Sequence, residues 1–199
     1  MSINVQAFLD EDIGSGDITA LIIPAACEAE ANVITRDAMV CCGQEWFNAV
    51  FNALSTDLKV QWHVQEGQWL AAGTLLCTLK GNARALLTGE RTALNLLQTL
   101  SAIATLARLY ANEVAGTGCQ VLDTRKTIPG LRDAQKYAVT CGGCHNHRIG
   151  LYDGILIKEN HIMAAGSIAQ AVAQARKISD KLLEVEVESM VELDQALAA

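Results

Sequence analysis

The chain has 199 residues, of which 51% are hydrophobic and 19% are charged, so it can bury a core and is not intrinsically disordered. No apolar run is long enough to span a bilayer, and the net charge of −7 argues against general binding to nucleic acid or to an anionic membrane. The cysteine number is odd, at seven, and the first residues lack the basic segment of a signal peptide, which together favour a reduced, cytoplasmic protein.

The first 115 residues predict an α+β domain. Residues 5–13 have helical spacing and lead into a glycine-rich turn. Between residues 29 and 79 the pattern is mostly strand-like, except for the helical stretch QEWFNAVFNAL. Residues 92–115 then predict a long helix with an apolar stripe, ended by two glycines. We therefore predict a sandwich-like N-terminal domain over residues 1–115 that ends in this helix.

Residues 116–199 change to an alternation of strands and helices. Strands are predicted at 119–124, 153–159 and 182–189, and each is followed by a predicted helix, at 129–139, 166–178 and 190–199. Such alternation is typical of βα units with a parallel sheet. Three units do not close a βα barrel, which takes about eight. We therefore predict that residues 116–199 are the first units of an α/β barrel, truncated in this chain.

Cations are concentrated in the middle of an otherwise acidic chain. Residues 90–161 hold 8 basic and 6 acidic residues (net +2), whereas residues 1–89 hold 4 and 10 (net −6) and residues 162–199 hold 3 and 6 (net −3). The loops after the predicted strands and helices of this segment present Arg125, Lys126, His147, Arg148 and Lys158. Because ligands of α/β folds bind at the carboxyl ends of strands, these groups predict a pocket for a polyanion. Glu186, on the next strand, could hold ribose hydroxyls or a Mg²⁺ ion that bridges phosphates.

Two other kinds of site compete with this interpretation. In TCGGCHNHR, Cys141 and Cys144 have C-x-x-C spacing and two histidines follow, as in a zinc site. We favour a glycine turn after a helix, which leaves His147 for the anion pocket and places Cys141 at the buried helix end. The stretch VQEGQWLAAGTLLCTLKG is similar to a biotinyl or lipoyl carrier, but Lys80 beside Gly81 is a poor candidate for the modified lysine.

Five long motifs, spread from Glu11 to Glu188, resemble those of quinolinate phosphoribosyltransferases, also called carboxylating nicotinate-nucleotide pyrophosphorylases. They are EDIGSGDIT, GERTALNLLQTLSAIAT, DTRKTIPGLRDAQKYAV, GGCHNHRIGLYDGILIKENHI and EVEVES. The resemblance implies a pentosyltransferase of NAD biosynthesis. Such an enzyme transfers a phosphoribosyl group from phosphoribosyl pyrophosphate to quinolinate and requires Mg²⁺. The products are nicotinate mononucleotide, pyrophosphate and CO₂.

The resemblance also implies a role for each matching residue. Arg125, His147, Arg148 and Lys158 would bind the carboxylates of quinolinate, and Lys126 would lie between quinolinate and the donor phosphates. Glu186 would hold the donor ribose or its metal, so Lys126 and Glu186 are the catalytic candidates. Thr124 and the acidic Glu188 would complete the substrate site. Arg91 would enter the active site of the neighbouring subunit, which makes the functional unit a homodimer.

The chain departs from the family pattern in two ways. Cys144 replaces the usual third glycine and is expected to add a side chain beside the quinolinate pocket. Family members also continue past residue 199, into a part expected to hold a further acidic residue and the loops for the donor 5′-phosphate. We therefore expect residues 1–199 alone to carry the quinolinate-site residues without competent catalysis, so that robust pyrophosphate release would refute this expectation.

Other assignments remain open on the sequence. A paralogue with the same fold, such as the phosphoribosyltransferase-like protein of molybdenum-transport operons, would take a different anionic acceptor. Nicotinate phosphoribosyltransferase would need fewer cations, since its acceptor has one carboxylate. Lys136 and Arg132, on the helix after Pro129, are expected to be solvated or to support the site from behind. The residues around Asp17 predict a capped turn, and His63 is expected to be a structural residue of a strand.

Overall fold

The computed structural model describes residues 4–199, which divide into two compact units, one ending at Asn146 and one beginning at His147. Each unit has its own hydrophobic core and is described by itself. The predicted domain boundary between residues 115 and 116 stays a prediction. Within the described part of the chain, no helix combines the length and the apolar character needed to cross a membrane.

The first unit is built on an antiparallel sheet with strand order β1-β5-β3, accompanied by a separate pair of short strands, β2 and β4. Its strands are β1 (Glu28–Ile34), β2 (Met39–Val40), β3 (Lys59–Trp62), β4 (Trp69–Leu70) and β5 (Leu75–Asn82). The long middle strand β5 pairs with both neighbours, so that Lys80 lies opposite Glu30 on one side and Lys59 on the other. The side chain of His63 follows β3 and lies 2.9 Å from Thr78 Oγ1 on β5, which confirms its structural role.

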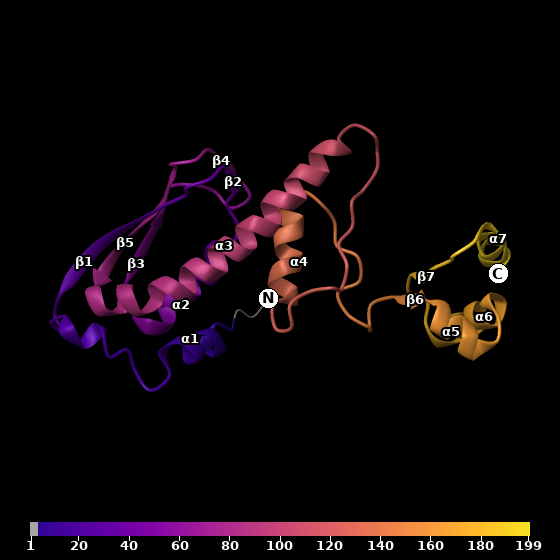
Figure 1. The fold of residues 1–199 in the computed structure, drawn as a ribbon, viewed down its shortest axis with the longest axis horizontal. Coiled ribbons are helices and arrows are strands. Elements are labelled where there is room, and N and C mark those ends of the chain that lie inside the picture. The colour runs from indigo at the N-terminus through magenta and orange to yellow at the C-terminus, as the bar shows by residue number, and fades with distance from the viewer. Residues whose placement is uncertain (1–3) are drawn as a thin grey trace. The chain divides into compact units, whose positions relative to one another are not determined.

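Four α-helices and one 3₁₀ turn complete the first unit, with the long α3 running beside the sheet and α4 packed on its later half (Figure 1). They are α1 (Gln6–Ile13), η1 (Ala20–Ile22), α2 (Gln44–Leu54), α3 (Ala83–Glu113) and α4 (Arg132–Cys141). Helix α2 has the bounds of the predicted stretch because its spacing buries Trp46, Phe47 and Val50 on one face. This face packs against α3, which crosses the whole core.

Two elements of the first unit differ from the prediction. Helix α3 begins at Ala83 and not at residue 92, because the Asn82 side chain accepts hydrogen bonds from the N–H groups of Arg84 and Ala85 and caps the helix there. The predicted strand at 119–124 is wrong as an extended strand, since it forms only one parallel bridge, between Leu122 and His145. None of its apolar side chains is buried, so no apolar face holds it against a sheet.

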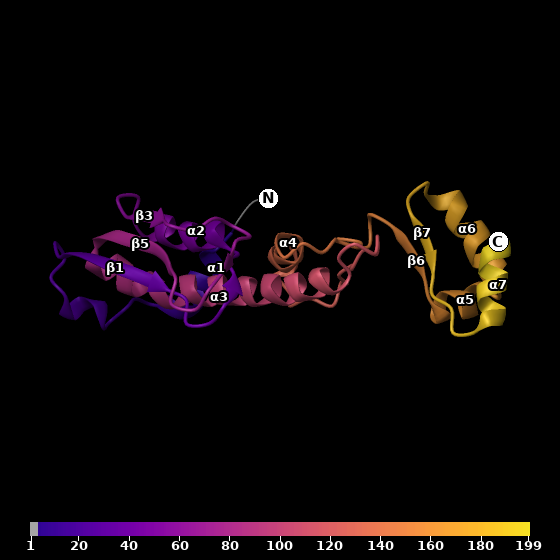
Figure 2. The ribbon, with the colours of Figure 1, turned by 90° about the horizontal axis from the view of Figure 1, so that it is seen from above.

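The second unit consists of parallel strands β6 (Ile155–Ile157) and β7 (Leu183–Val185), with three helices on one side of them (Figure 2). The helices are α5 (Glu159–Ala165), α6 (Ile168–Ile178) and α7 (Met190–Ala198). Helix α6 buries Ile168, Val172 and Ala175 against the strands, as its apolar spacing requires. A sheet domain followed by parallel βα units confirms the predicted fold class. The short helix α5 was not predicted; the Lys158 N–H donates to His161 Nδ1 at its start.

Candidate active site

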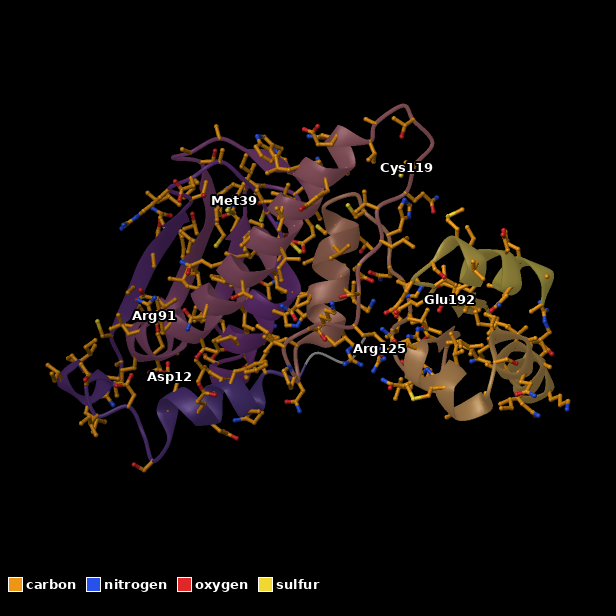
Figure 3. The ribbon with its side chains drawn as sticks, turned by 45° about the vertical axis from the view of Figure 1, so that its right-hand side comes forward. Asp12, Met39, Arg91, Cys119, Arg125 and Glu192 are labelled. Atoms are coloured by element: carbon orange, nitrogen blue, oxygen red, sulfur yellow. The ribbon has the colours of Figure 1, made fainter. Side chains whose placement is uncertain are left out.

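The loop of Thr124 to Lys126 is shaped by hydrogen bonds within itself. Thr124 Oγ1 accepts a hydrogen bond from the Lys126 N–H at 3.1 Å, and the Arg125 carbonyl accepts one from the Thr127 N–H at 2.9 Å. The turn leaves Thr124 and Lys126 exposed and half-buries Arg125, which lies on the segment leading to α4 (Figure 3). Arg125 Nε is buried and has no hydrogen-bond partner among residues 4–199. A buried, unpaired N–H of a cation is costly, so a bound anion would satisfy it.

A buried ion pair supports this loop from behind. Lys136 on α4 is 2% exposed, and its Nζ lies 2.5 Å from Oδ1 of Asp123, which is 7% exposed. In the amide orientation that suits its neighbours, Asn146 donates to Asp123 Oδ2 at 2.7 Å and to the Lys136 carbonyl at 2.9 Å. The alternative that Lys136 is solvated is therefore wrong, because its side chain joins the loop before α4 to the segment after it. Arg132 Nε, on the same helix, donates to Thr127 Oγ1 at 3.1 Å.

The glycine turn after α4 forms as predicted. Gly142 ends the helix, and Gly143 has a φ of +99°, which suits glycine. A Cβ on Gly142 would lie 2.4 Å from the Ala104 carbonyl oxygen, so only glycine lets the end of α4 approach α3 this closely. Cys144 is buried and its Sγ donates to the Ala107 carbonyl at 3.1 Å. The expectation that Cys144 intrudes on a pocket is therefore wrong, because its side chain packs against α3.

The alternative zinc site in TCGGCHNHR finds no converging set of ligands among the described residues. Cys144 Sγ is directed to α3, while His147 Nε2 lies 2.7 Å from Glu184 Oε2 in the second unit. Among the described residues, the three-donor cluster that could hold a metal contains Cys141 together with Cys42 and Glu66, and neither histidine.

In the second unit, His147 and Arg148 precede a loop that is fixed by an aspartate. Asp153 accepts hydrogen bonds from the N–H groups of Ile149 at 2.7 Å and Gly150 at 3.1 Å. The bond from Ile149, followed by that from Gly150, lowers the pKa of Asp153 below its usual 3.8. Arg148 Nη1 donates to the Gly154 carbonyl at 3.1 Å, but its Nε is buried without a hydrogen-bond partner in the described chain. Arg148 thus has a buried Nε without a hydrogen-bond partner in the described chain, as Arg125 does.

Lys158 and Glu186 lie at the carboxyl ends of β6 and β7 and form an ion pair. Lys158 Nζ is 2.9 Å from Glu186 Oε2, and both side chains are nearly half exposed. Beside them, a cavity of about 380 Å³ is lined by four carboxylates and three apolar side chains, namely Glu159, Glu186, Glu188, Glu192, Ile162, Met163 and Val187. Hard oxygen donors of this kind suit Mg²⁺, yet no three of them converge closely enough to hold an ion alone. They fit a Mg²⁺ that is bound mainly through phosphate oxygens.

Arg91 is exposed on α3 in the first unit, apart from the Thr124 to Lys126 loop (Figure 3). It lines a cavity of about 1070 Å³ between β1 and α3, together with exposed leucines at 87, 106 and 109. Within the second unit the structure thus brings together His147 with Glu184 and Lys158 with Glu186, while Arg91 belongs to the first unit. The roles of all these residues stay predictions.

Sequence models of two domains match nearly the whole chain. The N-terminal domain of quinolinate phosphoribosyl transferase matches residues 17–101, and the C-terminal domain of the same family matches residues 103–199. The chain belongs to the quinolinate phosphoribosyltransferase family. The confirmed resemblance accounts for the position of charged residues at the ends of β6 and β7.

Individual family members are similar over the same range. The chain is 42% identical over 194 residues to the probable nicotinate-nucleotide pyrophosphorylase [carboxylating] of Bacillus subtilis, covering 96% of this chain and 67% of the relative. The Mycobacterium leprae protein of that name is 40% identical over 199 residues, 98% of this chain and 70% of the relative. In the solved structure of the nicotinate-nucleotide pyrophosphorylase from Francisella tularensis, the chain is 48% identical to this one and superposes on it with a TM-score of 0.93, covering 98% of this chain and 69% of that one. The chain thus spans about two thirds of the length of these quinolinate phosphoribosyltransferase relatives.

Sequence reasoning gave no role to Glu184 or Asn146, and it noted Asp123 only as a charged residue at a strand end. Glu184 contacts His147, and Asp123 and Asn146 bind one another beside Lys136. Glu184 had a usable signal, because residues 184, 186 and 188 alternate and therefore share one face of the strand. Asn146 had none, since its contacts with Asp123 and Lys136 depend on how the chain folds back after α4.

Proposed function

We propose that the chain takes part in phosphoribosyl transfer from phosphoribosyl pyrophosphate to quinolinate, with decarboxylation to nicotinate mononucleotide, pyrophosphate and CO₂. The observation that carries this proposal is made in each unit by itself: the Nε atoms of Arg125 in the first unit and of Arg148 in the second are buried without a hydrogen-bond partner among residues 4–199. Guanidinium groups bind carboxylates through two parallel hydrogen bonds, and quinolinate has two carboxylates. The description of the matching family models, quinolinate phosphoribosyl transferase, supports the same acceptor.

The remaining cations fit the same chemistry. His147 and Lys158 would add positive charge around the acceptor. In the structure His147 contacts Glu184 and Lys158 contacts Glu186, and an anionic substrate would compete with these two carboxylates. Holding the pyridine nitrogen against the ribose carbon supplies proximity. The exposed Lys126 would balance charge that develops on the leaving pyrophosphate, with Thr124 shaping its loop.

The acidic cavity at the end of β7 suits the donor. Glu186 would bind ribose hydroxyls once Lys158 turns to the acceptor, and Glu188 lies beside it. Mg²⁺, when bound to the donor, would neutralise phosphate charge and orient the leaving group. Decarboxylation needs no nucleophile from the protein, because alkylation of the ring nitrogen makes the ring an electron sink.

We further propose a homodimer in which Arg91 reaches the active site of the neighbouring subunit. The 1070 Å³ cavity beside Arg91 supports this, because it exposes Leu87, Leu106 and Leu109 by half or more of their surface. An apolar face of this kind is typical of a protein interface. A second copy of the chain would cover it and place a cation at its edge.

Calorimetric titration with quinolinate tests the acceptor assignment. Arg125→Lys and Arg148→Lys keep the charge but lose the fork of donors, so each is expected to weaken binding roughly 10- to 100-fold, as for a charged hydrogen bond of about 1.5–3 kcal/mol. The exposed Arg176→Lys on α6 serves as the matched control and should leave the Kd unchanged. Wild-type affinity in both test variants would contradict the proposal. Binding of another anion in place of quinolinate would favour the paralogue with a different acceptor.

A further inference from the structure

Two cysteines and a glutamate from three separate segments of the first unit meet at one point. The Sγ atoms of Cys42 and Cys141 and a carboxylate oxygen of Glu66 all lie within 4.8 Å of one another. Cys42 lies between β2 and α2, Cys141 is the last residue of α4, and Glu66 precedes β4. None of the three belongs to the proposed substrate site, so the cluster requires an explanation of its own.

The two cysteines differ in burial. Cys42 is fully buried, and its backbone is fixed on both sides by Ser101, whose Oγ accepts from the Cys42 N–H at 3.0 Å and donates to the Cys42 carbonyl at 3.1 Å. Cys141 is only half-buried, at the end of α4. Of the two cysteines, Cys141 is therefore the one nearer to solvent.

The electrostatics also distinguish the pair. A hydrogen bond from the Cys42 thiol to Cys141 raises the pKa of Cys42 and lowers the pKa of Cys141. Burial raises the pKa of Cys42 further, and the positive charge of Arg108 helps to lower the pKa of Cys141. Arg108 is held there by hydrogen bonds to the carbonyls of Gly142 at 2.8 Å and Gly67 at 3.3 Å. The thiolate, which is the nucleophile, therefore forms first at Cys141.

The carboxylate of Glu66 binds backbone N–H groups at the start of α2. Glu66 Oε1 accepts from the Gly43 N–H at 2.7 Å, and Oε2 accepts from the Gln44 N–H at 3.2 Å, so the carboxylate caps the start of α2. Two thiols and a carboxylate committed to a helix fall short of the four ligands of a structural zinc site. The geometry favours chemistry between the two sulfurs.

We propose that Cys141 and Cys42 form a peroxide-sensitive pair that closes to a disulfide. The Cys141 thiolate attacks hydrogen peroxide, the O–O bond breaks, and hydroxide leaves and takes up a proton, which gives a sulfenic acid on Cys141. The Cys42 sulfur then attacks the Cys141 sulfur, the S–O bond breaks, and the oxygen leaves as water with the Cys42 proton. Two thiols and one peroxide thus give one disulfide and two waters. The cross-link would join the start of α2 to the end of α4.

Mass spectrometry of the folded chain treated with hydrogen peroxide tests the pair. We expect a loss of two hydrogen atoms in intact mass, reversed by dithiothreitol, and a cross-linked peptide that contains residues 42 and 141. Cys42→Ser and Cys42→Ala should instead accumulate a sulfenic acid on Cys141 that dimedone traps, while Cys141→Ser should leave Cys42 unmodified. Two variants are used at position 42 so that the test still stands if one of them does not fold. Circular dichroism checks the fold of each variant.

The matched control is Cys41→Ser, since Cys41 is the adjacent residue and is equally buried. Burial raises the pKa of Cys41 to about 11, so it should be unreactive, and its loss should leave the cross-link intact. A disulfide that Cys41→Ser abolishes, or that Cys42→Ser leaves intact, would overturn the proposal. So would full resistance of wild type to peroxide, or stoichiometric zinc on both thiols of the purified protein.

Discussion

Arg125 and Arg148 each bury a guanidinium Nε that finds no acceptor in residues 4–199. The cost of such a group is about 1–3 kcal/mol or more, because water is lost and nothing replaces it. Arg148 still has the Gly154 carbonyl as one partner, which holds its side chain in place. Both residues therefore bury an unsatisfied donor, which is expected of groups that bind an anionic substrate.

The buried Lys136 makes the first stability prediction. Lys136→Met removes the ammonium group 2.5 Å from the buried Asp123 carboxylate, and breaking such a pair costs about 3–5 kcal/mol. We expect the free energy of unfolding, measured in urea, to fall by this order. The double variant Asp123→Asn with Lys136→Met removes both charges and should recover much of the loss. An unchanged unfolding midpoint for Lys136→Met would contradict this account of the ion pair.

For single residues, the positions of charged side chains at strand ends were easier to predict from the sequence than the packing around a side chain. The stretches ILIKE and EVEVES placed a cation and carboxylates at the ends of two predicted strands, where Lys158 and Glu186 indeed meet. The direction of Cys144 was predicted wrongly, and for Lys136 the sequence left open whether it is solvated or supports the site from behind. Both depend on how α4 packs on α3, and a local pattern of residues does not encode that contact.

Among the connecting elements, two loops are each fixed by a single aspartate. Asp153 orders residues 149–154, directly after Arg148, and its pKa is lowered by the N–H groups of Ile149 and Gly150. Asp17 does the same in the turn after α1, where it accepts from the Ala20 N–H and from Thr88 Oγ1, as the capped-turn prediction required. In each case the charged form is the one that stabilises the fold.

This gives a pH-dependent prediction for Asp153→Asn. Since the folded pKa of Asp153 is below 3.8, its charge contributes stability above that value, which is lost as the pH falls through the folded pKa. The variant should therefore unfold at lower urea concentration than wild type at pH 7, and the difference should shrink at about pH 3. A difference that is constant across this range would show that the carboxylate charge plays no part.

Helices and strands were predicted well where the spacing of apolar residues gives them a buried face, and poorly where it does not. Helix α2 was predicted to the residue because Trp46, Phe47, Val50 and Phe51 recur on one face. The strand at 119–124 was predicted wrongly because its alternation has no buried face, and α5 was missed because it has seven residues and buries none of them. The parallel pairing of β6 and β7 followed correctly from the βα alternation.

At the scale of the whole molecule, the apolar cavity on α3 predicts self-association. Leu106→Asp places a charge on this face, where Leu106 is 56% exposed, and should shift the chain from dimer toward monomer in sedimentation equilibrium. Leu197→Asp on α7 is an exposed leucine outside this face and should leave the mass unchanged. If wild type is monomeric at all concentrations, the proposed role of Arg91 in a neighbouring site fails with it.

The central claim is that the acceptor is a dicarboxylate, and comparison of two ligands tests it most directly. Quinolinate and nicotinate differ by the 2-carboxylate, which the proposed site would bind with a second cationic group. Calorimetry on the folded wild-type chain should therefore give a Kd for quinolinate at least about tenfold lower than for nicotinate, a difference of about 1.4 kcal/mol or more. Equal affinities, or tighter binding of nicotinate, would contradict the account.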